Sequence, residues 1–280
     1  MVSRILELSP ESASKKNTQG ELPLHSLYSF QCEVKSRLMK IAARIHALAG
    51  NIDESQSAAL EETLVKSQES QLKVAKMLLR EFPMGIRHRE SAFGRLPLHY
   101  ACMWSTRSDD IQLIIQAYPE GAKKIDVHGA YPLPYACSNP NIQSPCKILR
   151  ILHNLNHVAV QVKDQSQECT LLSYLCQNQA VSLGDPSITF LVHQNPMRVR
   201  LQDQSGCLLF HYIFRKICKE NFPGEVIHML KQLVLLYPLG VCVPDKRGST
   251  ALLILLCGMC FIDGMQRESS SEFFSFGERH

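Results

Sequence analysis

The chain has 280 residues, of which 45% are hydrophobic and 20% are charged, a composition typical of a folded protein and too apolar for a disordered one. Its formal net charge is +4, and Lys and Arg are spread along the chain, so the charge gives no indication of a nucleic-acid partner. The 11 cysteines are an odd number, and several lie in apolar stretches, which favours reduced thiols packed in a core.

The N-terminal residues and the longest apolar run bear on the cellular compartment. The first residues contain no apolar run as long as that of a signal peptide, and residues 1–19 are expected to form a flexible N-terminal segment. The longest apolar run, from Ala251 to Ile262, is too short to span a bilayer. We therefore expect a soluble protein of the cytoplasm or nucleus, without a membrane span.

A short pattern that starts with glycine recurs along the chain. The residues four, seven and eight positions after the glycine are apolar, as expected for one face of a helix. The pattern is clear in GELPLHSL, GRLPLHYAC and GAYPLPYAC and weaker in GCLLFHYIF and GSTALLILLC. These strings begin at Gly20, Gly94, Gly129, Gly206 and Gly248.

A second apolar pattern ends at a proline in LLREFP, LIIQAYP, FLVHQNP and LVLLYP, and it predicts a second helix with one buried face. The residues eight positions before this proline, or before its equivalent, are expected to be buried in equivalent places: Leu38, Ala75, Ile111, Ile148, Ile188 and Leu230. In three units an aspartate lies three residues before the starting glycine: Asp126, Asp203 and Asp245. Each unit is thus predicted to be a helix, a turn, a second helix and a short loop.

Two further units are predicted although they lack the starting glycine. Asp164 precedes a start near Glu168. The long interval between Gly20 and Gly94 resembles an insertion, but the helix frame also divides it into two units with a hidden start at Gln56. The hidden repeat is the sharper interpretation. It predicts seven starts, near residues 20, 56, 94, 129, 168, 206 and 248.

This arrangement resembles the ankyrin repeat, whose units open with Gly-x-Thr-Pro-Leu-His. The opening is matched at Gly94, Pro97, Leu98, His99 and Ala101, and again at Gly20, Pro23, Leu24 and His25. The resemblance implies an all-α, ankyrin-like solenoid over residues 20–260, with an incomplete last unit and a polar tail at residues 261–280. It also implies structural roles for His25, His99 and His211. Leu22, Leu96 and Tyr131 replace the capping Thr of the family, so another group must cap these helices.

Ankyrin-like arrays bind other proteins through the tips of the loops between repeats and through their first helices. The resemblance therefore implies a non-catalytic scaffold for protein–protein interaction, and it leaves the partner and the oligomeric state open. The predicted binding residues lie between the aspartate and the glycine of three loops: Val127, His128, Gln204, Ser205, Lys246 and Arg247. A regulatory or targeting segment of a larger enzyme is the alternative.

Two cysteine patterns have a chemical and a simpler interpretation. Cys257 and Cys260 form a C-x-x-C, half of a common zinc site, but their flanks are apolar and the other half is not evident. Cys207 and His211 are spaced like a nucleophile and a base on one helix, but an orienting acid is not evident. Other cysteines fall on the apolar face of a first helix: Cys102, Cys137 and Cys176. Core packing is favoured throughout, so we expect neither metal nor cofactor, and a zinc- or cysteine-dependent enzyme is the least favoured alternative.

The C-terminal unit lacks its expected second helix. After the apolar helix that starts near Ala251, the chain continues with DGMQRESSSEFFSFGERH, and nothing obvious covers Leu252, Leu255 and Leu256. Three explanations are open: the tail folds back through its phenylalanines, this surface meets a partner, or the chain is part of a longer protein.

Overall fold

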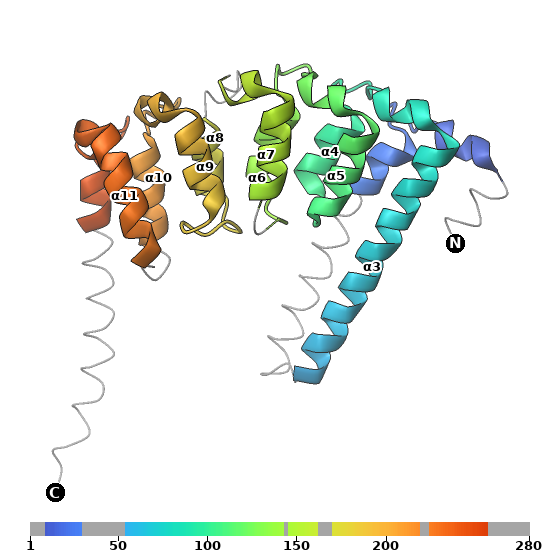
Figure 1. The fold of residues 1–280 in the computed structure, drawn as a ribbon, viewed down its shortest axis with the longest axis horizontal. Helices are drawn as coiled ribbons and strands as arrows, with labels where there is room; N and C mark the ends of the chain where they lie inside the picture. The colour runs from blue at the N-terminus through green and yellow to red at the C-terminus, as the bar shows by residue number, and fades with distance from the viewer. Residues whose placement is uncertain (1–8, 30–53, 143–144, 162–169, 219–223, 257–280) are drawn as a thin grey trace, which may run out of the picture. The chain divides into compact units, whose positions relative to one another are not determined.

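The computed structural model describes residues 9–29, 54–142, 145–161, 170–218 and 224–256 (Figure 1). The chain divides into two compact units, Met1–Gln165 and Ser166–His280, which are described separately. Within the described ranges the regular structure is helical, apart from one isolated antiparallel bridge between Pro244 and Thr250. The predicted all-α fold class is confirmed.

In the first unit, pairs of helices alternate with short 3-10 helices. The elements in chain order are η1 (Pro10–Ser14), a helix over residues 23–29, α3 (Glu54–Glu81), η2 (Pro83–Arg87), α4 (Pro97–Trp104), α5 (Ser108–Ala117), η3 (Pro119–Lys123), α6 (Pro132–Ser138), α7 (Cys146–Leu155) and η4 (His157–Val160). The first helices of neighbouring repeats pack together, α4 on α6, and so do the second helices, α5 on α7. This two-row packing is the arrangement of an α-solenoid.

The second unit repeats the same order of elements. They are α8 (Leu171–Gln177), α9 (Pro186–Gln194), η5 (Pro196–Arg200), α10 (Leu209–Ile217), α11 (Gly224–Leu236), η6 (Pro238–Val241) and a helix over residues 251–256. Here α10 packs on α8, again first helix on first helix. Thr170 caps α8 by accepting a hydrogen bond from the Ser173 amide. The residue before each first helix lies two positions after the repeat start, which agrees with a start at Glu168; that residue lies outside the described ranges.

The glycines that define the repeat frame adopt the backbone conformation that the pattern predicts. Their φ angles are positive: Gly20 76°, Gly94 64°, Gly129 76°, Gly206 75° and Gly248 80°. Residues other than glycine avoid this left-handed region because their Cβ atom clashes with the following carbonyl oxygen. These five glycines therefore occupy equivalent turn positions.

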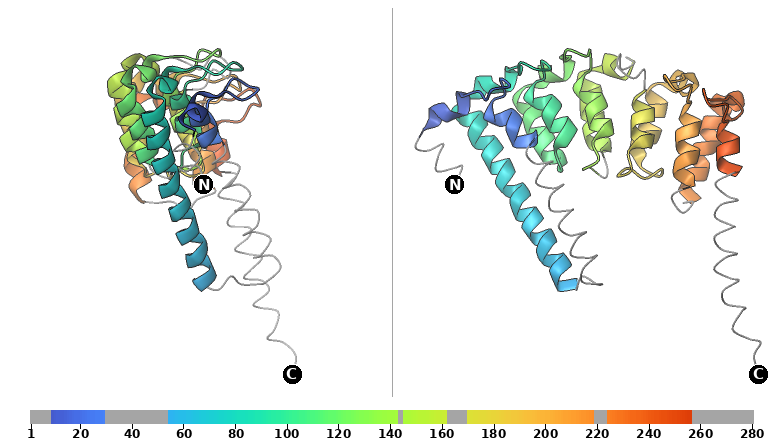
Figure 2. Two further views of the ribbon diagram at one scale, coloured as in Figure 1. Left: turned by 90° about the vertical axis from the view of Figure 1, so that its right-hand side faces the viewer. Right: turned by 180° about the vertical axis from the view of Figure 1, so that it is seen from behind.

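The prediction of a hidden repeat that starts at Gln56 is wrong. Gln56 lies inside α3, which runs without a break over the region where the prediction required two helices and a turn (Figures 1 and 2). The Ser91 amide donates to the Gln19 carbonyl at 3.2 Å, so the loop before Gly20 lies beside the loop before Gly94. The unit that starts at Gly20 therefore precedes the unit at Gly94 directly, and the extra residues are an insertion. The C-terminal part of α3 is its second helix, and the rest of α3 extends well past α4 and α5.

The described part of residues 1–19 differs from the expected flexible segment. Residues Pro10–Ser14 form η1, which contacts α3, and Ala13 is buried. The same kind of 3-10 helix follows the second helix of the later repeats, and proline suits its first turn because an N–H there has no helical partner. Residues 10–20 thus repeat the end of an ankyrin-like unit.

The predicted core positions of the second helices are largely confirmed. Four of them are buried as predicted: Ala75, Ile111, Ile148 and Ile188. Leu38 lies outside the described residues. Leu230 on α11 is only half-buried, and Leu252 and Leu256 on the last described helix are exposed. The apolar face therefore loses its cover toward residue 256.

Candidate interaction surface

An acidic or amide side chain holds each described loop between repeats, and the acidic ones are buried. In the loop before Gly129, Asp126 Oδ1 accepts hydrogen bonds from the amides of His128 at 2.9 Å and Ala130 at 3.0 Å. The glycine amide closes the turn by donating to the Asp126 carbonyl at 3.1 Å. Asp203 and Asp245 make the same three kinds of contact in their own loops. Side-chain hydrogen bonds of this type fix the turn, and the two residues inside it are left at the tip.

Two loops use other residues in place of aspartate. Asn17 Oδ1 accepts from the amides of Gln19 and Glu21, and Glu90 accepts from the amides of Ala92, Phe93 and Arg95. Both were missed because the sequence pattern required aspartate. A pattern that accepts any polar side chain with an acceptor oxygen, three or four residues before the glycine, identifies both residues.

Hydrogen bonds favour the charged form of two loop carboxylates, those of Asp126 and Asp245. Burial alone would raise the pKa of Asp126, but hydrogen bonds from the Tyr135 hydroxyl, the Ala130 amide and Arg95 outweigh it and lower that pKa. In Asp245, the burial effect is likewise outweighed by hydrogen bonds from the amides of Ser249 and Arg247, and its pKa is lowered.

All six predicted binding residues are exposed at the loop tips. Val127 and His128 lie in the first unit, where the Val127 amide donates to the Phe93 carbonyl of the neighbouring loop at 2.9 Å. In the second unit, the Lys246 amide donates to the Ser205 carbonyl at 2.9 Å. This bond brings the tip of Gln204 and Ser205 next to the tip of Lys246 and Arg247. The structure thus gathers the predicted residues into one group in each unit.

The first unit adds residues that the sequence did not indicate. Phe93 and Ile125 are exposed next to Val127, which is 65% exposed. The ring of Phe93 lies 5.9 Å from the ring of His128 and 4.4 Å from the guanidinium carbon of Arg95. We call Phe93, Ile125, Val127 and His128 the aromatic tip patch. Phe93 was missed because its loop begins with Glu90 instead of aspartate.

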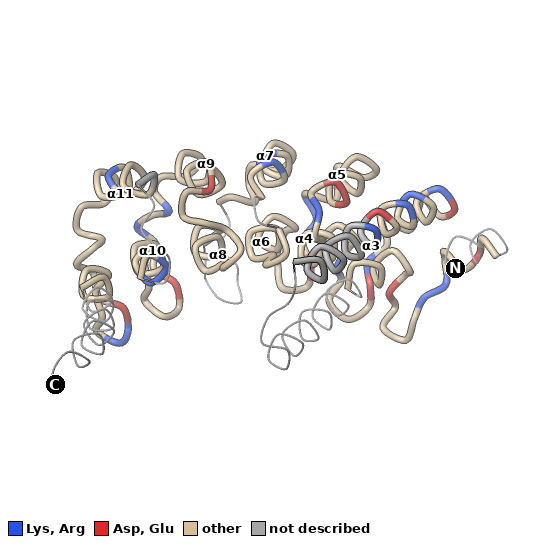
Figure 3. Tube along the Cα trace, turned by 90° about the horizontal axis from the view of Figure 1, so that it is seen from below, with Lys and Arg blue, Asp and Glu red and all other residues tan. Residues whose placement is uncertain are grey.

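The two groups of tips differ in chemistry. The aromatic tip patch is apolar, and Arg95 at its edge also forms an ion pair with Asp126 at 3.3 Å and a hydrogen bond to the Tyr135 hydroxyl at 3.1 Å. The tips of the second unit carry Lys246 and Arg247, and Figure 3 marks these charges on the loop that follows α11. Exposed aromatic and Arg side chains are typical of residues that dominate protein interfaces.

The three motif histidines are structural, as the resemblance implies. The Nδ1 atoms of His25, His99 and His211 accept hydrogen bonds from the amides of Leu22, Leu96 and Leu208 at 3.2, 3.1 and 2.9 Å. These bonds replace the missing Thr cap at Leu22 and Leu96. The Nε2 atoms of His25 and His211 donate to carbonyls of the next repeat, those of His88 and Ser249, both at 3.1 Å. Burial lowers the pKa values of His25 and His99 to about 4, so both rings are neutral.

Four of the described cysteines are core residues, whereas Cys146 and Cys218 are half-buried and Cys242 is exposed. Cys102, Cys137 and Cys176 are buried, and burial raises the pKa of each thiol, that of Cys176 to about 12. Cys207 is buried with a raised pKa, and both ring nitrogens of His211 are already bonded to the backbone, so the pair does not form a nucleophile and base. Cys257 and Cys260 lie outside the described residues. In the described ranges no group of three His, Cys, Asp or Glu side chains is placed to hold a metal ion.

The chain is built of ankyrin-like repeats, yet no protein-family model and no curated protein sequence matches it. Among solved structures it is similar to a Bd0816 predatory endopeptidase from Bdellovibrio bacteriovorus in complex with immunity protein Bd3460, with a TM-score of 0.49 and 14% identity over 69% of this chain and 89% of that one. It is also similar to the human ASB11 ankyrin repeat domain, with a TM-score of 0.48 and 18% identity over 83% of this chain and 90% of that one. No described helix is long and apolar enough to cross a membrane.

Proposed function

We propose that this chain is a non-catalytic scaffold that binds another protein through the tips of its loops. The observation that carries the proposal is the common construction of the tips. A carboxylate or amide side chain fixes each described loop, and the side chains between it and the glycine are exposed. A rigid loop loses little conformational entropy on binding, which favours association.

The basic tips of the second unit provide the first test. The double substitution Lys246→Glu and Arg247→Glu reverses two exposed charges and leaves the Asp245 contacts to the backbone in place. We expect recovery of the partner by affinity capture to fall at least about tenfold, because charged residues at an interface reject a partner of like charge. Quantitative mass spectrometry of captured proteins measures the change.

The matched control reverses the same charges away from the tips. Lys73 and Lys76 on α3 are also exposed, and Lys73→Glu with Lys76→Glu is expected to leave recovery unchanged. An equal loss in both double variants would mean that net charge, and not the tip, governs capture. Unchanged recovery in the Lys246 and Arg247 variant would remove these tips from the site.

The aromatic tip patch provides the second test. Phe93→Ser removes its central ring but retains the backbone carbonyl that accepts from Val127. Truncation of a central aromatic side chain in an interface typically costs 2 kcal/mol or more, so we expect the affinity for a captured partner to fall by about 30-fold. Met197→Ser, at an exposed apolar residue in the second unit, is the control. Equal affinities for the two variants would exclude the patch.

A further inference from the structure

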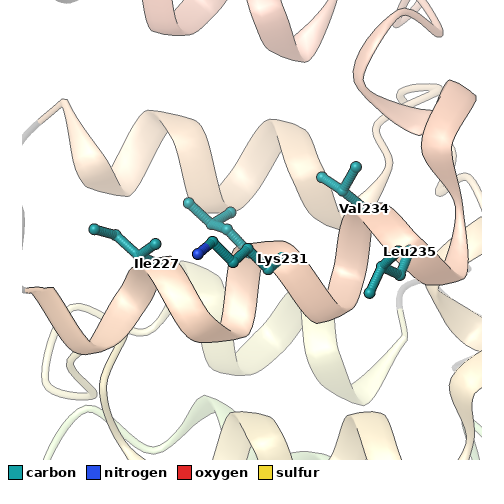
Figure 4. A pocket seen from close by; sticks show the side chains of 5 residues that line it. Ile227, Lys231, Val234 and Leu235 are labelled. Atoms are coloured by element: carbon teal, nitrogen blue, oxygen red, sulfur yellow. The ribbon is translucent and has the colours of Figure 1, made fainter.

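The outer face of α11 is apolar and exposed. Ile227, Val234 and Leu235 are exposed, Leu235 by 81%, and Leu230 is half-buried. Together with Lys231 these residues line a depression along the helix (Figure 4). Their spacing of three to four residues makes a continuous stripe. We call these five residues the α11 stripe.

The α11 stripe departs from the equivalent helices in two ways. Four residues before the proline or its equivalent, Ile115 of α5, Leu152 of α7 and Val192 of α9 are all buried, whereas Val234 is 38% exposed. One residue later the other helices carry polar side chains, and α11 carries leucine: Gln116, His153 and His193 correspond to Leu235. Val234 is therefore exposed at a position that is buried in the other helices. Leu235 adds apolar surface at a position that is polar in the other helices.

Basic side chains lie on the α11 stripe and at its end. Three acidic side chains of the second unit, Asp185, Asp203 and Asp245, are buried. Lys231 belongs to the stripe. Arg200 is exposed at its end, where it donates to the Leu236 carbonyl at 3.0 Å. A ligand of this face therefore meets apolar side chains flanked by positive charge.

We propose that the α11 stripe binds an amphipathic helix of another protein, with an apolar face and acidic flanks. An apolar stripe with a three-to-four-residue period accepts the apolar face of a second helix, which covers Val234 as the next repeat covers its counterparts and also covers the added Leu235. Carboxylates on the flanks of the bound helix lie near Lys231 and Arg200, where hydrogen bonds between oppositely charged groups are stronger than neutral ones. This face is separate from the loop tips, so it is a second docking site.

Two synthetic peptides test the proposal on the full chain. Each is about 18 residues long, or five helical turns, with the same leucine stripe; one carries Glu on its flanks and its twin carries Lys. In fluorescence anisotropy we expect the Glu peptide to bind at least about tenfold more tightly than the Lys peptide. Lys231→Glu is expected to remove this preference, and high salt to weaken it.

Leu235→Asp is the decisive variant, and His193→Asp at the corresponding exposed position of α9 is its control. Both residues are exposed, so the fold is retained, and circular dichroism checks this. Leu235→Asp should weaken binding of the Glu peptide at least about tenfold, and His193→Asp should not. Equal binding of the twin peptides, or equal effects of the two variants, would overturn the proposal. Two other results with Leu235→Asp would also overturn it. Loss of a dimer in sedimentation would show that a second copy of the chain occupies the stripe. Loss of hydrogen-exchange protection elsewhere in the chain would show that the chain's own residues occupy it.

Discussion

Lowering the pH from 6.5 to 4 is expected to remove about 6 kcal/mol of stability from the first unit. The pKa values of His25 and His99 are about 4 in the folded chain because both rings are buried, against 6.5 in the unfolded chain. Between these values the unfolded chain binds protons that the folded chain does not, so stability is fully present above pH 6.5 and falls as the pH falls toward 4. Each pKa unit corresponds to about 1.4 kcal/mol, which gives about 3 kcal/mol for each histidine. Hydrogen exchange of the first unit, measured as a function of pH, reports the loss of stability.

Variants of the two histidines separate this effect from the titration of other groups. His25→Gln with His99→Gln lowers stability at pH 7, because hydrogen bonds to the amides of Leu22 and Leu96 are altered. The same double variant should flatten the dependence between pH 6.5 and 4, and each single variant should remove about half of it. A double variant that loses as much stability on acidification as the unaltered chain would contradict this role for the histidines.

Gly206→Ala is expected to destabilise the second unit by about 3 kcal/mol. At φ 75° an alanine costs about 1 kcal/mol of backbone strain, and its Cβ would lie only 2.9 Å from the Lys246 amide nitrogen. Backbone cannot move away as a flexible side chain can, so overpacking adds about 2 kcal/mol. The bond from the Lys246 amide to the Ser205 carbonyl joins these two loops, and it is the contact most directly strained.

Gly248→Ala is the matched control for the steric part. Gly248 has nearly the same φ, 80°, but a Cβ there meets no atom within 4 Å. We expect this substitution to cost only the strain, about 1 kcal/mol. Urea unfolding monitored by hydrogen exchange of the second unit compares the free energies of unfolding of the two variants. Equal costs would show that the loops can separate freely and that the contact between them contributes little.

The positions of glycine and proline in the sequence made much of the fold predictable. A tight turn needs a positive φ, and glycine provides it at low cost, so Gly94 and Gly206 marked repeat starts reliably. Apolar periodicity alone was less informative at Gln56. One long helix has the same 3.6-residue period as two short ones, and the stretch from Asn51 to Phe82 contains no glycine or proline that would end a helix.

The candidate sites were predictable only in part, because exposure depends on tertiary contacts. The positions of Val127 and Lys246 followed from the Asp and Gly that flank them. Phe93 and Leu235 are apolar side chains whose sequence context fits a core as well as a surface. Only the packing of neighbouring loops and helices leaves them exposed.

The insertion between the first two repeats has a consequence for the order of folding. Contacts between the repeats at Gly94 and Gly129 join residues that are near in sequence, such as Phe93 and Val127. The bond between Gln19 and Ser91 instead requires closure of a chain segment about twice as long, which adds only about 0.6 kcal/mol of entropic cost. We therefore expect the N-terminal repeat to fold later than its neighbours with little loss of stability. It docks onto repeats that have already formed.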